Sequence, residues 1–318
     1  MSYPTSDIKE NILLAPYTYF KIGGPARYFI EATDGEGVAS VVAFAKSRDL
    51  PFFILGAGSN ILVSDNGFPG VVIRMRNNNF AIADERVTVG AGLPMAQLVA
   101  KAVAGGYGGI EWAIGIPGTV GGSVRGNAGC FGGEIKNVTE RAQIFDTVKG
   151  ETRWLSTAEC RFGYRTSVFK ERPEWVLLAL KLKLSRGSKE KSQALIREYA
   201  AKRTEAQAIG EKSAGCIFKN IAWERWGVNE KKLRQRLPDL PLSGTVSGIP
   251  AGYLIDRAGL TGYRVGGAEV SKRHGNFVIN AGGATAEDVV MLIGIIKDRV
   301  RRQFGVLLEE EIQYVGFE

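Results

Sequence analysis

The strongest constraint on this chain is a glycine-rich run from Gly115 to Gly129, which contains six glycines among fifteen positions. Because glycine has no Cβ, main-chain N–H groups there can approach a ligand closely, and a positive φ costs little. A second turn of small residues, Gly56 to Asn60, follows the apolar run from Pro51 to Leu55. Successive amides in such loops form concavities that hold anionic oxygens. The two loops predict a long, phosphate-bearing ligand that the main chain holds in two places.

Neither loop matches a common nucleotide fingerprint. A dinucleotide G-x-G-x-x-G motif needs glycine three places after Gly58, where this chain has Ile61, and no glycine in either loop precedes the lysine of a phosphate-loop motif. An isolated glycine is usually only a turn residue. Glycine occupies 41 of 318 positions, however, about 13% against a usual level of about 7%. That density favours phosphate binding over a set of unrelated turns.

Composition points to an ordinary soluble enzyme of two or three domains, with 45% hydrophobic and 23% charged residues. No apolar stretch approaches the roughly 20 residues of a membrane helix, and the N-terminus lacks the apolar core of a signal peptide. We therefore expect a cytoplasmic protein with no membrane partner. The three cysteines are odd in number and widely spaced, so the sequence predicts neither a disulfide framework nor a metal site.

The formal net charge of +8 suggests anionic partners. Nucleic-acid-binding proteins tend to concentrate their positive charge on one face. Here the basic residues form several separate patches with acidic residues among them. We expect anionic small molecules and no nucleic acid. A basic DNA-binding protein stays an alternative, which a yellow purified protein without salt-dependent DNA retention would exclude.

Hydrophobic periodicity predicts strands near 29–30, 52–55, 71–73 and 87–89, helices over 37–47 and 95–104, and turns at 66–67 and 69–70. Residues 135–184 look strand-rich, and a polar stretch then leads into a helix that ends at Arg203. Farther along, the pattern predicts a short helix stopped by Gly259 and a longer helix from a capping-box-like Thr285 to Phe304. A final strand is expected at 309–312, with Glu309 and Glu311 on one side.

Taken together, seven segments resemble the UDP-N-acetylenolpyruvoylglucosamine reductase family, flavoenzymes that complete UDP-N-acetylmuramate in peptidoglycan synthesis. The segments occur in the family's order and span nearly the whole chain: 20–24, 56–60, 115–129, 162–167, 213–220, 251–280 and 308–312. The resemblance implies an α+β fold with an FAD-binding domain of the p-cresol-methylhydroxylase type over residues 1–200. That domain would have two subdomains split near residue 80, and a C-terminal α/β substrate-binding domain would follow over 201–318. Only 51 positions separate Arg165 from Cys216, which indicates the family type that lacks an extra tyrosine-bearing loop.

The resemblance also implies the ligands. FAD would be bound noncovalently, with its pyrophosphate on main-chain amides of the two glycine loops, and NADPH would be the co-substrate. UDP-N-acetylglucosamine-enolpyruvate would be the substrate of a monomeric enzyme. The residues expected to contact FAD are Gly56, Ala57, Gly58, Ser59, Asn60, Gly118, Thr119, Gly121, Gly122, Ser123 and Asn127.

Three residues match the family's catalytic positions. Arg165 would hold the substrate carboxylate as negative charge develops there, a task suited to a planar and always protonated guanidinium. Cys216 stands where the family usually has serine, and it would donate a proton to C2, the enol-ether carbon that bears the carboxylate. A thiol, with a pKa near 8.5, is a stronger acid than a hydroxyl. Glu311 matches the family's acidic residue, and burial beside apolar neighbours would favour its protonated form. Cys130 and Cys160 are read instead as small buried residues.

Five further residues are expected to contact substrate: Tyr164, Arg203, Lys219, Asn220 and His274. Ile221 departs from the family's usual proline, which puts the local turn in doubt but not the chemistry. One rival function is an oxidase of the same FAD fold, some members of which tether flavin through histidine. Because His274, the single histidine, lies outside the expected FAD domain, the sequence argues against that tether.

Overall fold

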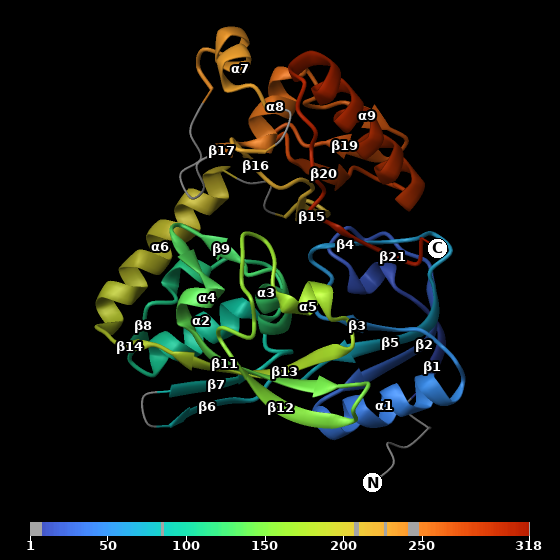
Figure 1. Cartoon of the computed structure of the whole chain (residues 1–318), viewed down its shortest axis with the longest axis vertical. Coiled ribbons are helices and arrows are strands. Elements are labelled where there is room, and N and C mark those ends of the chain that lie inside the picture. The colour runs from blue at the N-terminus through green and yellow to red at the C-terminus, as the bar shows by residue number, and fades with distance from the viewer. Residues whose placement is uncertain (1–7, 84–85, 207–209, 226–227, 241–247, 318) are drawn as a thin grey trace. The chain divides into compact units, whose positions relative to one another are not determined.

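Figure 1 shows the computed structural model of the chain, which describes residues 8–83, 86–206, 210–225, 228–240 and 248–317. The described residues divide into two compact units. The first unit contains the residues up to Ile12, Ala26–Ala57 and Phe68–Arg203. The second contains Leu13–Pro25, Gly58–Gly67 and the chain from Thr204 onward.

The first unit begins with a four-stranded sheet in the order β1-β2-β5-β3, in which β2, β5 and β3 run parallel. Helix α1 begins at an N-cap, Asp34, whose side chain accepts the Gly37 N–H at 2.8 Å. Its buried positions Val38, Val41, Val42 and Ala45 form the apolar face that the periodicity predicted. The bounds are β1 Lys9–Leu13, β2 Pro25–Ala32, α1 Gly35–Ser47, β3 Phe52–Leu55 and β5 Phe68–Met75.

A second, antiparallel sheet in the first unit has the order β12-β11-β13-β7-β6. Its strands are β6 Phe80–Ala83, β7 Arg86–Gly90, β11 Thr139–Asp146, β12 Glu151–Ser156 and β13 Trp175–Lys183. Alternate residues such as Val87, Val89 and Leu180 are fully buried and pack in one core with helix α2. The strands of the two sheets are therefore separate in sequence, since the first sheet ends at Met75 and the second begins at Phe80.

The remaining elements of the first unit are short, apart from α2 and α6. The helices are α2 Met95–Ala104, α3 Val120–Arg125, α4 Ile135–Val138, α5 Val168–Glu171 and α6 Lys189–Ala206, with a 3-10 turn at Glu111–Ala113. Two small antiparallel pairs complete it: β8 Tyr107–Gly108 with β14 Ser185–Arg186, and β9 Gly129–Cys130 with β10 Gly133–Glu134. Helix α3 lies within the glycine-rich run, and the β9–β10 hairpin begins at the end of that run. This part of the first unit therefore carries part of the candidate site.

The second unit has a four-stranded sheet in the order β15-β20-β19-β18, packed with helices α8 and α9 around one apolar core (Figure 1). Helix α9 has the predicted capping box, since Thr285 Oγ1 accepts the Asp288 N–H at 3.0 Å, and it ends at Gly305 with a φ of 72°. The bounds are 3-10 turn Ala15–Tyr17, β4 Ile61–Val63, β15 Ser213–Cys216, β16 Ile221–Ala222, α7 Glu230–Arg236, β17 Gly248–Ile249, α8 Ala251–Arg257, β18 Arg264–Val265, β19 Ala268–Val270, β20 Phe277–Asn280, α9 Ala286–Phe304 and β21 Gln313–Val315.

The two units are not contiguous in sequence, unlike the predicted division at residue 200. The C-terminal unit gains 13–25 and 58–67 because Phe20, Ile22 and Leu62 are buried in its core. Strand β4 also pairs in parallel with β21, at the other end of the chain. Apolar burial by a few N-terminal residues thus recruits them to the second unit.

Two local predictions were wrong. The expected turn at 69–70 lies inside β5, where the register with β2 shifts between Ala26 and Tyr28, so Pro69 and Gly70 form a bulge rather than a turn. The expected last strand at 309–312 is not regular, because β21 begins only at Gln313 and Glu310 makes an isolated bridge to Phe218.

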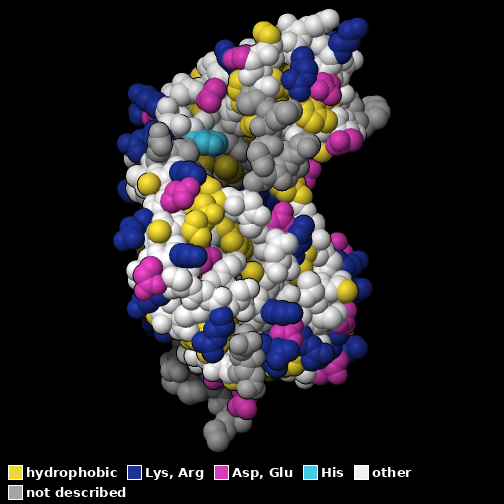
Figure 2. Space-filling model, turned by 90° about the vertical axis from the view of Figure 1, so that its left-hand side faces the viewer, with side chains coloured by type: hydrophobic (Ala, Val, Ile, Leu, Met, Phe, Trp, Pro, Cys, Tyr) yellow, Lys and Arg dark blue, Asp and Glu magenta, His cyan; other side chains and the backbone are white. Residues whose placement is uncertain are grey.

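Surface charge is dispersed, as expected from the sequence. On the face shown in Figure 2, Lys and Arg side chains are interspersed with Asp and Glu rather than gathered in one field. Within the described part of the chain, no helix is both long and apolar enough to span a membrane.

Candidate active site

The glycine-rich run folds around the start of α3 in the first unit. Thr119 caps this helix and accepts the Gly122 N–H at 3.3 Å. The N–H groups of Val120 and Gly121 donate to the carbonyls of Leu93 and Ala91 at 2.9 and 2.8 Å. The start of α3 is therefore bound to the segment between β7 and α2.

These bonds separate the predicted FAD-contact residues into two groups. A Cβ on Gly121 would lie 3.1 Å from both the Cβ and the carbonyl oxygen of Ala91, so this glycine permits close packing of α3. Ser123 is buried, and its N–H donates to the Thr119 carbonyl at 3.0 Å. By contrast, the N–H groups of Gly118 and Thr119 have no acceptor among the described residues. Those two amides are available to an anionic ligand.

The second glycine turn, Gly56 to Asn60, crosses from one unit to the other between Ala57 and Gly58. On the first unit's side, Gly56 packs against Thr119, since a Cβ there would lie 2.7 Å from Thr119 Oγ1. The N–H groups of Gly56 and Ala57 find no acceptor in the described part of the chain. The two loops that the sequence singled out thus meet in the first unit, with unused main-chain donors in both.

On the second unit's side, Asn60 is bonded to the segment that carries the predicted acid, Glu311. Its side-chain Nδ2 donates to the Glu311 carbonyl at 3.2 Å, and its own carbonyl accepts the Gln313 N–H at 3.1 Å. Gly58 has a φ of +68° and accepts the Tyr19 N–H at 3.0 Å. The Asn60 side chain is thus used to hold Glu311, which sequence reasoning did not anticipate.

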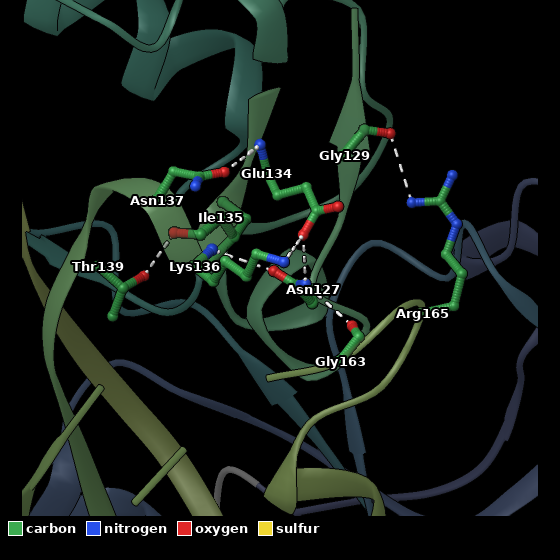
Figure 3. Close-up of polar contacts among 9 residues, drawn as sticks. All are labelled: Asn127, Gly129, Glu134, Ile135, Lys136, Asn137, Thr139, Gly163 and Arg165. Atoms are coloured by element: carbon green, nitrogen blue, oxygen red, sulfur yellow. Dashed lines mark hydrogen bonds and ion pairs between the residues drawn. The ribbon is translucent and has the colours of Figure 1, made fainter. Parts of the chain in front are cut away.

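Arg165 sits in a tight turn of the first unit (Figure 3). Gly163 and Thr166 exchange both main-chain hydrogen bonds, at 3.0 and 3.3 Å, so that Tyr164 and Arg165 form the tip. Arg165 has a φ of +53°, an uncommon conformation for a residue other than glycine. Its Nη1 donates to the Gly129 carbonyl at 3.3 Å, and its guanidinium carbon lies 5.5 Å from the centre of the Tyr164 ring. The turn thus brings Tyr164 and Arg165 together.

Arg203 also lies against the glycine-rich run in the first unit. Its Nη1 donates to Cys130 Sγ at 3.7 Å, and its Cδ packs where a Cβ on Gly115 would be 2.8 Å away. Cys130 is therefore a half-buried thiol beside a cation. Cys160, in contrast, is fully buried in the core, where burial raises its pKa to about 12. The interpretation of Cys160 as a packing residue is confirmed.

In the second unit, Cys216 ends strand β15 just after a bulge. The pairing of β15 with β20 shifts register between Ser213 and Cys216, and Gly215 there has a φ of +78°. Bulges of this kind re-aim the side chain that follows. Cys216 is half-buried and pairs with Phe277.

The segment after Cys216 is bonded to the segment that carries Glu311. The Glu311 N–H donates to the Ile217 carbonyl at 2.7 Å, and the Lys219 N–H donates to the Glu309 carbonyl at 2.9 Å. Glu311 therefore lies opposite the residue next to Cys216. Glu309 is exposed and its carboxylate is ion-paired with Lys219 and Arg225, whereas Glu311 is half-buried between the buried Leu308 and Ile312. The structure thus brings Cys216, Lys219 and Glu311 onto adjacent segments.

Two other predicted substrate residues have local structural partners. The Asn220 side chain accepts the Ala251 N–H at 3.3 Å, at the first residue of α8. His274 Nδ1 accepts the Asn276 N–H at 3.1 Å, and burial lowers the pKa of this imidazole. A neutral ring in this arrangement carries its proton on Nε2. His274 can therefore donate a hydrogen bond from Nε2 without being charged.

Comparisons with known proteins identify the family of this chain. Residues 207–315 match the family model described as UDP-N-acetylenolpyruvoylglucosamine reductase, C-terminal domain, and residues 26–156 match an FAD binding domain. The reductase of Carboxydothermus hydrogenoformans is 38% identical over 98% of this chain and 95% of its own length. That of Anoxybacillus flavithermus is 36% identical over 97% and 94%. The chain belongs to the UDP-N-acetylenolpyruvoylglucosamine reductase family.

A solved structure supports the same assignment. The UDP-N-acetylenolpyruvylglucosamine reductase of Thermus caldophilus aligns with a TM-score of 0.74 at 33% identity, covering 97% of this chain and 99% of that one. The predicted family and fold class are therefore confirmed, and the chain is an oxidoreductase with an FAD-binding domain. FAD fits the first unit of this reductase, because the two loops offer unused main-chain donors of the kind that a pyrophosphate needs. No cluster of three or more potential metal ligands occurs among the residues that the structure describes.

Three residues of this reductase were not identified from sequence as site residues. Asn276 holds the segment after Cys216, Lys170 donates from Nζ to the Arg165 carbonyl at 2.8 Å, and Glu134 faces Asn127. Asn276 carried a usable signal, because it is a polar residue directly before the apolar strand Phe277 to Ile279. Lys170 and Glu134 carried none, since both look like ordinary surface charges in the sequence.

Proposed function

We propose that this reductase converts UDP-N-acetylglucosamine-enolpyruvate to UDP-N-acetylmuramate for peptidoglycan precursor synthesis, with FAD as its bound redox group and NADPH as the reductant. The observation that carries the proposal is the bonding of the Cys216 segment to the Glu311 segment, with the Glu311 N–H on the Ile217 carbonyl at 2.7 Å. That register keeps a thiol and a carboxyl on adjacent segments, as protonation of a carbanion-like centre requires.

FAD would be held by the main-chain N–H groups of Gly56, Ala57, Gly118 and Thr119. When bound, FAD would supply the redox chemistry, carrying two electrons from NADPH to the enol ether, whose C3 would gain a hydride. The protein's own contribution is to bind the substrate, stabilise charge and deliver a proton. The remaining steps concern the side chains that do so.

Arg165 would bind the substrate carboxylate. As C3 gains hydride, negative charge develops on C2 and the attached carboxylate, and a fixed guanidinium stabilises that charge. The turn at Gly163–Thr166 supports this role, because it fixes the main chain of Arg165 while Gly129 orients its side chain. A preorganised donor of this kind loses little free energy to reorientation during the reaction.

Cys216 would give its thiol proton to C2, and the resulting thiolate would be reprotonated from solvent before the next turnover. Glu311 would assist by holding the carboxyl end of the substrate from its half-buried position between Leu308 and Ile312. Lys219 and His274 would contribute donors to the substrate's diphosphate from the same unit.

Anaerobic rapid mixing tests the proposal. NADPH should bleach the flavin absorbance of the purified protein, and the enolpyruvyl UDP-sugar should restore it. In Cys216→Ala, bleaching should be nearly unchanged while recolouring slows by at least about 10²-fold, the lower range for a positioned general acid. Cys216→Ser should recolour much faster than the Ala variant, because its hydroxyl can take the same place.

Cys160→Ala is the matched control, since Cys160 is a buried core thiol in the first unit. It should bleach and recolour like the wild type. Alkylation should abolish recolouring in the wild type but spare Cys216→Ser, with substrate protecting. A Cys216→Ala variant that recolours at the wild-type rate would remove Cys216 from the mechanism, and protein that never binds flavin would refute the proposed function.

A further inference from the structure

Asn127 uses its entire side chain inside the first unit (Figure 3). It is 1% exposed, and its Nδ2 donates to Glu134 Oε2 and to the Gly163 carbonyl, both at 2.9 Å. Its Oδ1 accepts the Lys136 N–H at 3.0 Å, and its main-chain N–H donates to the Val124 carbonyl at 3.1 Å. Both amide hydrogens and the main-chain N–H are thereby engaged. Asn127 has no donor left for a phosphate.

The bond to Gly163 fixes the base of the turn that presents Arg165. The Gly163 carbonyl accepts two hydrogen bonds, one from Thr166 within the turn and one from Asn127 outside it. A positive φ at a residue such as Arg165 is strained and persists only where surrounding contacts hold it. The Asn127 amide is such a contact, because it holds the turn from outside.

The bond to Glu134 fixes the acceptor of the Arg165 side chain. Glu134 lies directly opposite Gly129 in the β9–β10 hairpin, and the Gly129 carbonyl accepts Arg165 Nη1 at 3.3 Å. Burial opposes ionisation of Glu134, but hydrogen bonds from Lys136 and Asn127 hold its pKa below the usual value. The hairpin is therefore anchored to Asn127 by a charge-assisted hydrogen bond, which is stronger than a neutral one.

We propose that Asn127 is a positioning residue for Arg165, tying the turn that carries the guanidinium to the hairpin that orients it. The side-chain amide of Asn127 bonds both elements that contact Arg165. It bonds the Gly163 carbonyl at the base of the turn that carries Arg165, and through Glu134 it holds the hairpin whose Gly129 carbonyl accepts the Arg165 side chain. The inference rests on the proposed function of Arg165 as the partner of the substrate carboxylate. It replaces the expectation that Asn127 contacts FAD.

Asn127→Ala removes all three side-chain bonds, and Asn127→Asp keeps the size while replacing both donors by an oxygen that faces Glu134 and the Gly163 carbonyl. Both variants should retain flavin and bleach with NADPH at close to the wild-type rate. Recolouring by the enolpyruvyl substrate should slow at least about 10-fold, part of the 10²–10³-fold that a preorganised charge contact contributes. The KM for that substrate should rise, while the KM for NADPH stays unchanged.

Thr139→Val is the matched control for lost stability. Asn127 accepts the N–H of Lys136 in the first turn of α4, and Thr139 follows the last residue of that short helix. Thr139 is buried, and its Oγ1 donates to the Ile135 carbonyl at 2.9 Å (Figure 3). The variant loses this buried hydrogen bond but leaves the bonds of Asn127 to Gly163 and to the hairpin in place. It should lower the melting temperature without slowing recolouring.

A double-variant cycle decides whether Asn127 acts through Arg165. In an Arg165→Met background, Asn127→Ala should slow recolouring by less than about 2-fold further, because the group that it positions is gone. If the slowing of recolouring in the double variant equals the product of the two single effects, the inference is overturned. It is also overturned if Asn127→Ala binds less flavin while the flavin that remains recolours at the wild-type rate. If Arg165→Met alone recolours at the wild-type rate, the proposed role of Arg165 fails first, and the inference falls with it.

Discussion

Asn276 offers a quantitative test of how the segment after Cys216, the proposed proton donor, is held. The residue is 3% exposed, and its side chain exchanges two hydrogen bonds with the main chain of Phe218, at 2.9 Å from the Phe218 N–H and 2.8 Å to the Phe218 carbonyl. Its own carbonyl accepts the Ile217 N–H at 2.9 Å. Asn276 thereby continues the pairing of β20 with the residues that directly follow Cys216.

Replacing Asn276 by alanine leaves the N–H and C=O of Phe218 without their side-chain partner. Phe218 is 1% exposed, so water cannot reach these groups without local opening. Each buried polar group left unpaired costs about 1–3 kcal/mol, so the loss of both partners should lower the unfolding free energy by about 2–6 kcal/mol. At about 2–4 °C per kcal/mol for a domain of roughly this size, the melting temperature of the second unit should fall by about 10 °C.

The assay is urea and thermal unfolding, followed by recolouring of the reduced enzyme with substrate. Asn280→Ala, at the last residue of β20, is the control, because its side chain bonds Phe20, Gly282 and Ala284 rather than the Cys216 segment. Both variants should lose stability, but only Asn276→Ala should also slow recolouring, since it loosens the segment after Cys216, the proposed proton donor. A loss of stability below about 1 kcal/mol would refute the reasoning, because that is the net value of a single ordinary hydrogen bond.

Three further predictions concern charge. Arg165→Met should fold and bind flavin but recolour with substrate about 10²–10³-fold more slowly, as rapid mixing would measure. Burial lowers the pKa of His274, so the unfolded chain binds its proton first, and stability should fall as pH drops below about 6.5; urea unfolding of His274→Asn, which keeps an acceptor for the neighbouring N–H, should lack that part of the pH dependence. The main-chain N–H groups of Thr285 and Gly267 lower the pKa of Asp288. Asp288→Asn should therefore be less stable than the wild type above about pH 4, with the difference vanishing as pH falls through the lowered value.

Much of the fold could be predicted because the local signals agree with the tertiary structure. Helix α9 has a capping box, an apolar stripe and a terminal glycine, and all three appear in the structure where the pattern placed them. The bulge at Pro69 could not be predicted in this way. Pro69 and Gly70 are common turn residues, and only the pairing of β5 with strands on both sides keeps the chain extended there. Segment 58–67 was assigned to the wrong unit for a similar reason, since Leu62 is apolar in either context.

The candidate site shows the same limit more sharply. Glycine density identified the two loops, but not that Gly121 serves packing against Ala91 while Gly118 and Thr119 keep their amides available. Whether a small polar residue in a loop faces a ligand or a neighbouring segment depends on contacts made far away in sequence. Asn60 illustrates this, because it lies within a predicted cofactor turn and yet donates its side-chain N–H to the Glu311 carbonyl, 251 positions later.

Three asparagines share one structural role. Asn127, Asn60 and Asn276 each bond the main chain at or beside a predicted catalytic residue or its turn. A side-chain amide suits this task because it offers a donor and an acceptor at once without adding charge. In this chain the candidate reactive groups were proposed from sequence motifs, whereas the amides that hold their segments in place emerge only from the folded main chain.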